Sequence, residues 1–359
     1  MNIKKKGDPK MKVVKKHNNN NRVELYDNYL GLEWSQVNCV LARMHSNSQR
    51  VKLDEYRSAP SQNLKSLKKQ LKEIRGNKIL TIEETTTTHW LYVELKEYVD
   101  KILICDPYRN SLLSEGAKTD KIDARKLCQL LRSGLVKEVY HSLENDYKIR
   151  KLVSTYEDVV KAGVRVLNQR SALYRAVGLQ VKKDKLPEDE IYKLVDRSQE
   201  RSIGLYLEEK KEYEKIFKQL RRSNKTINNL CSISGIAEIG AVKIYSRVIE
   251  AGRFPSKYKY WSYCGLVTHE KESGNRSYGK KQGRYSRTLK SVYKTAAWTA
   301  VGGKNDIREY YEYLLKEEYL SERKAINQVA RYIAKSTLAI IKNTESYKPY
   351  SWRKTKSDK

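Results

Sequence analysis

The sequence predicts an α/β layer, followed by two long helices and a mainly helical C-terminal part. Short apolar runs alternate with segments of helical periodicity between residues 28 and 131. This alternation is typical of α/β proteins whose sheet is partly parallel. A helical apolar stripe then continues among many charges through residues 146–230, and helical spacing of apolar residues returns in 320–342.

The α/β layer is predicted to contain four strands and three helices. Residues 29–44 are rich in β-branched, aromatic and aliphatic residues and predict one strand turning into another. Leucines recur at helical spacing behind a Pro-Ser start and predict a helix over 64–74. The remaining elements follow in order: a strand over 77–84, a helix over 89–99, a strand over 101–107 that Pro107 ends, and a helix over 118–131.

Two long helices folded back on each other are the simplest account of residues 146–230. The helices would pair as an antiparallel coiled coil, with the reversal near Pro187. A helical linker without a partner is the alternative. The apolar stripe consists of Ile149, Leu152, Tyr156, Val159, Val166 and Leu173.

The C-terminal part is predicted to be helical around a polar middle. Residues 230–248 predict helices on either side of a Gly-containing turn. Residues 252–286 are rich in Gly, Ser and Lys and predict loops. The apolar residues of 320–342 mark one face of a final helix.

These patterns divide the chain into five segments. The first 22 residues are mostly Lys and Asn, have almost nothing to bury, and are predicted to be disordered. A nucleic-acid-binding arm and a solubilising tail are both consistent with that composition. The predicted segments are a basic tail over 1–22, an α/β domain over 23–145, a helical hairpin over 146–229, a C-terminal domain over 230–345, and a second basic tail over 346–359.

The charge balance indicates a polyanionic partner. The 359 residues include 73 Lys and Arg against 43 Asp and Glu, a formal net charge of +30. Such an excess is self-repulsive in a free enzyme and favours nucleic acid as the usual partner. The 39% of hydrophobic residues is too many for a wholly disordered chain.

Several classes of protein are excluded. No apolar stretch approaches the ~20 residues of a membrane helix, and the basic start lacks the apolar core of a secretory signal. The five cysteines form no CxxC pair and the five histidines no HExxH pattern. We therefore expect a reducing, cytoplasmic compartment, in association with the nucleoid, and neither a zinc ribbon nor a zincin protease.

Four carboxylates are candidates for metal-dependent chemistry. Glu33 lies inside an apolar strand and Glu84 ends another, while Asp120 and Asp123 are three apart on a predicted helix and share a face. Carboxylates are the ligands that hard divalent cations take, and such ions promote phosphodiester displacement. The alternative is a strand-edge charge at Glu33 and favourable helix-terminal charges at the two aspartates.

A basic segment with serines is the second candidate site. Ser273, Ser277 and Ser286 lie among many cations, and a serine hydroxyl can attack a phosphodiester while cations stabilise the charge that develops. A flexible loop that only contacts the DNA backbone is the alternative. The candidate nucleic-acid-binding cations are Lys271, Arg276, Lys280, Lys281, Arg284 and Arg287.

Two further features are consistent with a nucleic-acid partner. Gly235 and Gly240 suit a helix-hairpin-helix turn whose backbone amides hold a phosphate, although a plain helical hairpin fits as well. The chain has 27 Tyr but only 2 Phe, and exposed Tyr can stack on unpaired bases. Tyr that simply fills core sites is the alternative.

Taken in their order along the chain, several motifs resemble those of the DEDD-type insertion-sequence transposases, the bridge-RNA-guided serine recombinases. The resemblance runs from about residue 28 to about residue 342, and KTDKIDARKL carries its most specific motif. The matching segments are LGLEWS (30–35), EETTTTHW (83–90), KTDKIDARKL (118–127), CSISGIAEIGA (231–241) and YCGLVTHEKESG (263–274).

The resemblance implies a RuvC-like, RNase H-type domain joined through a coiled coil to a helical C-terminal domain. It implies that Glu33, Glu84, Asp120 and Asp123 hold Mg²⁺ and that Ser273 is the nucleophile. It also implies target and donor DNA, a structured guide (bridge) RNA and a homo-oligomer, a dimer or tetramer, as partners.

The sequence departs from the family pattern mainly at Glu33, where the family has Asp. A longer carboxylate alters the spacing available to Mg²⁺, which demands near-ideal octahedral geometry. Two alternatives therefore stay open. One is a RuvC-like metal-dependent DNA nuclease whose C-terminal domain only binds, and the other is a non-catalytic RNA-binding scaffold.

Overall fold

The computed structural model describes residues 26–110, 118–141, 144–274 and 276–350. The predicted N-terminal tail and most of the predicted C-terminal tail lie outside these residues. The chain divides into two units, Met1–His141 and Ser142–Lys359. The boundary falls close to the predicted end of the α/β domain, while the long helices belong to the same unit as the C-terminal helices.

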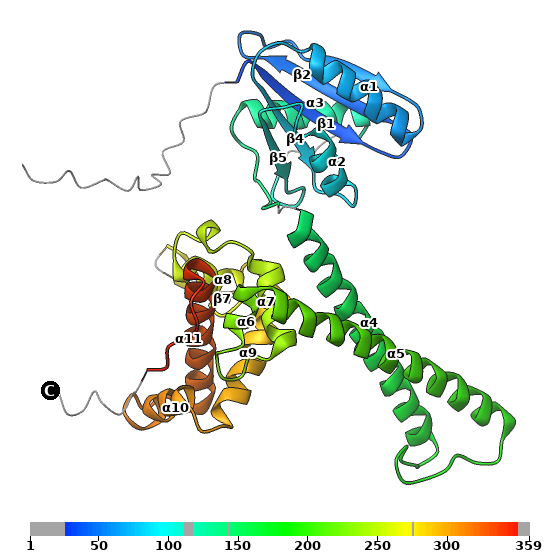
Figure 1. The fold of residues 1–359 in the computed structure, drawn as a ribbon, viewed down its shortest axis with the longest axis vertical. Coiled ribbons are helices and arrows are strands. Elements are labelled where there is room, and N and C mark those ends of the chain that lie inside the picture. Colours follow the sequence, from blue (N-terminus) through cyan, green and yellow to red (C-terminus); the bar gives the residue numbers. More distant parts are fainter. Residues whose placement is uncertain (1–25, 111–117, 142–143, 275, 351–359) are drawn as a thin grey trace, which may run out of the picture. The chain divides into compact units, whose positions relative to one another are not determined.

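The first unit is built on a five-stranded mixed sheet with the strand order β3-β2-β1-β4-β5 (Figure 1). The first three strands form an antiparallel meander, whereas β4 and β5 run parallel to β1. The sheet confirms the predicted mixed α/β class, with β3 as a strand that the sequence patterns did not indicate. The strands are β1 (Asn28–Trp34), β2 (Cys39–His45), β3 (Lys52–Tyr56), β4 (Lys78–Glu83) and β5 (Lys101–Cys105).

Helices cover both faces of this sheet. The helices α1 (Pro60–Glu73) and α2 (Thr88–Leu95) pack on the face that carries Leu30 and Leu32 of β1. The helix α3 (Asp120–Arg132) packs on the other face, against Tyr29. Because side chains alternate along a strand, the odd-numbered residues of β1 face α3.

Gly31 lets α3 approach β1 closely. A Cβ at this position would lie 2.5 Å from the backbone oxygen of Ala124 and 2.5 Å from the backbone nitrogen of Cys128. The Cys128 thiol donates a hydrogen bond of 3.1 Å to the Tyr29 carbonyl oxygen. This contact fixes the height of α3, and hence of its first turn, over the carboxyl end of β1.

The second unit begins with two long helices, α4 (Glu144–Ala176) and α5 (Glu190–Ser223), which fold back on each other. Tyr156 packs on Phe217, and farther along α4 Arg170 binds Asp196 at 2.7 Å. Because the later residue of α4 pairs with the earlier residue of α5, the two helices run antiparallel. The predicted helical hairpin is therefore present, and its supercoiling as a coiled coil stays a prediction.

The remaining helices share one core with the base of this hairpin. Tyr260 and Tyr293 are fully buried in it and hydrogen-bond to each other, and Tyr293 also contacts the Thr337 hydroxyl at 2.8 Å. The elements are α6 (Lys225–Leu230), α7 (Glu238–Val248), the 3₁₀ turn η2 (Ala251–Arg253), α8 (Lys257–Tyr263), α9 (Arg287–Val301), α10 (Asp306–Lys316) and α11 (Glu322–Asn343).

The prediction of loops over 252–286 is wrong in two places. Residues 257–263 form α8, and the segment after it forms an antiparallel hairpin of β6 (His269–Ser273) and β7 (Arg276–Lys281). Every described residue of the two strands is exposed, so neither strand shows the apolar alternation by which strands are recognised. In the described part of the chain, no helix combines the length and apolarity needed to cross a bilayer.

Candidate functional site

The first candidate site lies where the carboxyl ends of β1 and β4 meet the first turn of α3. Thr119 caps α3 by accepting a hydrogen bond from the Ile122 backbone nitrogen, which places Asp120 and Asp123 in the first helical turn. Leu32 of β1 is paired in register with Ile82 of β4, so Glu33 and Glu83 follow at equivalent positions on the face toward α3. Figure 1 shows α3 lying against one face of the sheet, behind β1 and β2.

Like charges and burial dominate the electrostatics of this site. The pKa of Glu33 is raised to about 8, chiefly by burial and then by the negative charges of the neighbouring Glu83, Asp123 and Asp120. Burial also raises the pKa of Glu83, with Asp123 as the next largest cause, while Lys118 opposes the shift. The four carboxyl groups therefore sense one another and form a single acidic cluster, defined here as Glu33, Glu83, Asp120 and Asp123.

The acidic cluster is short of hydrogen-bond donors. Glu33 Oε2 and Asp123 Oδ1 are buried and accept no hydrogen bond in the described structure. Among the described residues, Lys126 Nζ is the cation near Asp123 Oδ1, at 3.9 Å, whereas Asp120 Oδ2 accepts a hydrogen bond of 2.5 Å from Asn38 Nδ2. Buried carboxylate oxygens without donors are costly, so this cluster is suited to a positively charged ligand.

Glu84 lies outside the acidic cluster. Its side chain is exposed, and it follows the last residue of β4, although its backbone nitrogen still donates to the Cys105 carbonyl oxygen at 3.0 Å. The sequence-based candidate set contains Glu33, Asp120 and Asp123, which the structure brings together, and Glu84, which it does not. Strand alternation is the signal that separates the two glutamates, because Ile79, Thr81 and Glu83 share one face.

The chemistry of the acidic cluster fits a hard divalent cation, because all four side chains offer oxygen ligands and two of the oxygens have no partner. In the positions that the side chains occupy, no group of three or more His, Cys, Asp or Glu among the described residues is arranged to hold a metal ion.

The second candidate site is the exposed hairpin of β6 and β7 in the second unit, which we call the serine hairpin (269–281). Ser273 ends β6 and is paired with Arg276, at the tip of the hairpin, and its side chain is exposed. Glu270 and Lys280 form an ion pair of 3.3 Å across the strands. The structure thus presents Ser273 on an accessible, cation-rich projection.

The other two serines have different environments. Ser277 is exposed in β7 opposite Glu272. Ser286 caps α9, since its side-chain oxygen accepts a hydrogen bond from the Leu289 backbone nitrogen. The predicted cations Lys271, Arg276, Lys280, Lys281, Arg284 and Arg287 are all exposed in this segment.

Gly235 has a packing role. Its φ is +90°, and a Cβ would lie 2.3 Å from the Ala296 carbonyl oxygen of α9. Gly240 has ordinary surroundings, with Ile236 and Val292 at 3.5 and 3.7 Å from a Cβ. The turn before α7 is thus held against α9, and phosphate binding by its amides stays a prediction.

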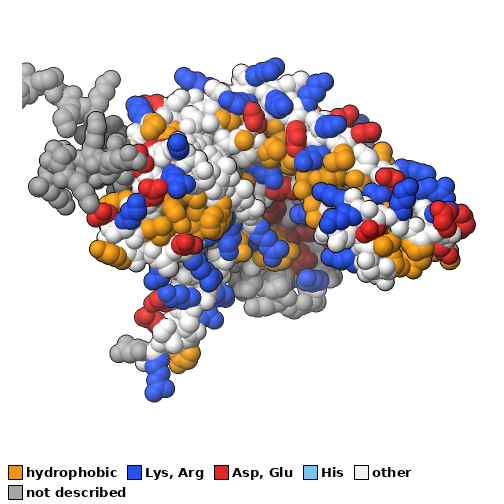
Figure 2. Space-filling model, turned by 90° about the horizontal axis from the view of Figure 1, so that it is seen from below, with side chains coloured by type: hydrophobic (Ala, Val, Ile, Leu, Met, Phe, Trp, Pro, Cys, Tyr) orange, Lys and Arg blue, Asp and Glu red, His pale blue; other side chains and the backbone are white. Residues whose placement is uncertain are grey.

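The basic charge is widely distributed. Lys and Arg side chains are spread over the face seen in Figure 2, with Asp and Glu side chains among them. Tyrosines are found in both predicted roles: Tyr260 and Tyr293 are buried in the core, whereas Tyr258 and Tyr278 are mostly exposed.

Comparison with protein-family models identifies the chain as a transposase. Residues 30–177 match a DEDD transposase model of the IS110 type, and residues 227–312 match the model described as the transposase IS116/IS110/IS902 family. The chain belongs to this family of insertion-sequence transposases, which confirms the resemblance carried by the motifs. A comparison with curated proteins finds no match.

Proposed function

We propose that this transposase is an RNA-guided DNA recombinase that cuts and rejoins strands through a covalent phosphoserine. The observation that carries the proposal is the exposure of Ser273 at the tip of a cation-rich hairpin. The acidic cluster in the other unit supports it, because the reaction then has a carboxylate site for a cation in addition to a serine nucleophile.

Ser273 would act as the nucleophile. Its hydroxyl oxygen forms a bond to the phosphorus of a DNA strand, and the bond from phosphorus to the 3′ oxygen breaks. The serine hydroxyl loses its proton, and the leaving 3′ oxygen gains one and becomes a 3′ hydroxyl. The 5′ phosphate stays on the serine, so attack by another 3′ hydroxyl rejoins the strand. The exposed cations of the serine hairpin would stabilise the charge on the phosphorus centre.

The acidic cluster would hold a divalent cation, and we propose Mg²⁺. Glu33, Glu83, Asp120 and Asp123 are the residues proposed to hold it, with Glu83 in the place that the motif comparison gave to Glu84. When bound, the cation would stabilise the attacking and leaving oxygens of the displacement. Glu33 must lose its proton to bind a cation near neutral pH, since its pKa is about 8.

We further propose that a structured RNA selects target and donor DNA and that the chain acts as a dimer or tetramer, because recombination holds four strands at once. The formal charge of +30 supports large polyanionic partners. Sequencing of the RNA that stays bound after nuclease treatment tests guidance. One discrete structured RNA from next to the gene is expected, and heterogeneous RNA or none would contradict guidance.

The phosphoserine is tested by trapping protein on DNA under denaturing conditions. Wild type and Ser277→Ala should form a covalent adduct, whereas Ser273→Ala should form none while binding nucleic acid as tightly as wild type. Ser277 is a matched control because it is also exposed and lies in the same hairpin. An adduct with Ser273→Ala would disprove this nucleophile, and free ends without any adduct would indicate the nuclease.

A further inference from the structure

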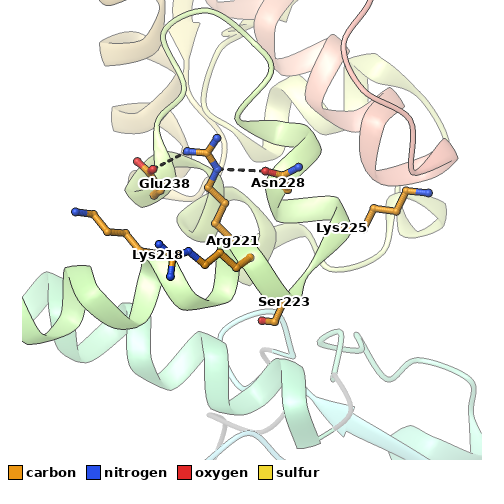
Figure 3. A pocket seen from close by; sticks show the side chains of 7 residues that line it. Lys218, Arg221, Ser223, Lys225, Asn228 and Glu238 are labelled. Atoms are coloured by element: carbon orange, nitrogen blue, oxygen red, sulfur yellow. Dashed lines mark hydrogen bonds and ion pairs between the residues drawn. The ribbon is translucent and has the colours of Figure 1, made fainter.

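A cavity in the second unit has no place in either candidate site. It has a volume of about 700 Å³ and lies where the end of α5, the short α6 and the start of α7 meet. Figure 3 shows Arg221 reaching from α5 toward Asn228 and Glu238, with Lys218 and Lys225 on either side. We call it the basic pocket.

The basic pocket has an unbalanced positive charge. Lys218, Arg221, Arg222 and Lys225 line it, and Glu238 is the lone carboxylate of the lining. Glu238 is already occupied, because Arg221 Nη1 donates to its Oε1 at 2.6 Å. Within the residues that the structure describes, no carboxylate forms an ion pair with the other three cations. Three like charges around one cavity repel one another unless an anion lies between them.

One member of the basic pocket is held in a fixed orientation. Arg221 donates from Nε to Asn228 Oδ1 at 3.2 Å, in addition to its bond to Glu238. The Glu238 carboxylate keeps the pKa of Arg221 above its usual value, so the guanidinium stays charged. A guanidinium that is oriented before binding loses little freedom when it contacts an anion, which favours geometric recognition of a phosphate.

The composition of the lining narrows the ligand class. The lining contains no aromatic ring and no purely hydrocarbon side chain, so it lacks the aromatic platform and the apolar wall that are typical of base-binding and small-molecule sites. The remaining members, Ser223 and Asn228, are small polar groups that can hydrogen-bond to phosphate oxygens. Contacts of this kind position a nucleic acid strand without reading its sequence.

We propose that the basic pocket seats a phosphodiester of a nucleic acid strand and thereby fixes that strand against the base of the helical hairpin. The proposal rests on the nucleic-acid partners of the proposed function, and it adds a binding site separate from the serine hairpin and the acidic cluster. The ligand is the backbone phosphate, which RNA and DNA share.

The test compares two variants with the same loss of charge. The pocket variant is Lys218→Gln/Arg222→Gln/Lys225→Gln in the full chain. The control is Arg201→Gln/Lys211→Gln/Lys215→Gln, three exposed cations of α5 that do not line the pocket and have no ion-pair partner in the described part of the chain. Binding of one RNA duplex and of the DNA duplex of the same sequence is measured at several salt concentrations between about 50 and 300 mM. Over roughly this range, the loss of affinity with salt reports the number of phosphates that the protein neutralises.

Each phosphate contact contributes about 0.9 to the slope of log K against log salt for duplex DNA. Because the pocket seats one phosphate, the pocket variant should lose about 0.9 from this slope with RNA, DNA or both, and the duplex that is affected identifies the source of the phosphate. The control should leave the slope unchanged within about 0.3. Equal losses in the two variants would overturn the proposal, because they would mean that the pocket cations act only as general charge.

Titration with inorganic phosphate separates a backbone site from a free-anion site. Phosphate that binds wild type but not the pocket variant, together with equal salt slopes, would assign the pocket to a free anion and overturn the proposal. The adduct assay keeps the two hypotheses apart. Adducts with equal slopes would refute the pocket alone, and a reduced slope without any adduct would refute the phosphoserine alone.

Discussion

The acidic cluster and the serine hairpin place reactive groups in opposite physical settings. Glu33 and Glu83 sit at the ends of two paired strands beneath α3, where the backbone is fixed and burial shifts their pKa values. Ser273 lies on a two-stranded hairpin without a single buried residue among those described. A nucleophile that reacts with a large polyanion must be exposed. Carboxylates that together attract a cation act more strongly when they are partly buried and held by a rigid backbone.

The largest effect that separates the two settings is expected within the acidic cluster itself. Glu83→Gln should reduce recombination by about 10²-fold or more, because even residues that only support a metal ligand cost up to about that much. Glu84→Gln should leave the rate within about threefold of wild type, since its side chain is exposed. Recombination of a plasmid substrate measures both, and the reverse ranking would restore Glu84 to the site.

The rigidity of the acidic cluster can be broken through Gly31. Gly31→Ala forces a Cβ against the α3 backbone and should lower the free energy of unfolding of the first unit by about 3 kcal/mol. Gly204→Ala in α5 is the control, because nothing lies within 4 Å of its Cβ and Ala favours a helix by about 1 kcal/mol. Faster hydrogen exchange confined to residues 28–34 and α3 would confirm the contact, and unchanged exchange would contradict it.

The pH dependence of stability sharpens the contrast further. The pKa of Glu33 rises from 4.5 to about 8, so the folded chain binds more protons than the unfolded chain in that window. In the presence of a chelator, the contribution of Glu33 should therefore be fully present below pH 4.5 and should be lost as the pH rises to 8. The loss relative to Glu33→Gln should be about 2 to 4 kcal/mol.

Urea unfolding of wild type and Glu33→Gln at several pH values measures that loss. Addition of Mg²⁺ at pH 8 should restore stability to wild type and have little effect on Glu33→Gln. Parallel pH curves for the two proteins would contradict the burial of Glu33.

The smallest effect is expected on the serine hairpin. Glu270→Gln removes an exposed ion pair of 3.3 Å and should change the free energy of unfolding by at most about 0.5 kcal/mol. Thermal unfolding measures this change. A larger loss would show that the hairpin is more tightly held than its exposure indicates.

The sequence was informative wherever one face of an element is buried. The strands of 29–44 were predicted because β-branched, aromatic and aliphatic residues are concentrated there, and the helix over 64–74 because apolar residues recur at helical spacing. Asp120 and Asp123 were placed together by the same helical spacing. The hairpin strands β6 and β7 could not be predicted in this way, because both of their faces are polar. The choice between Glu83 and Glu84 depended on strand register, which motif spacing alone does not supply.

Glu157 gives the long helical hairpin a mechanical role. Its carboxylate accepts hydrogen bonds from Arg247 and Thr288, both at 3.0 Å, and lies 3.6 Å from Lys243, so α4, α7 and α9 are tied at one point. From Glu157 to the end of α4 the helix extends roughly 28 Å, so a rotation of about 5° at this pivot moves the far end by about 2.5 Å. A force applied at the far end of the hairpin would therefore reach α7 and α9 through Glu157, and α9 begins a few residues after the segment that carries Ser273.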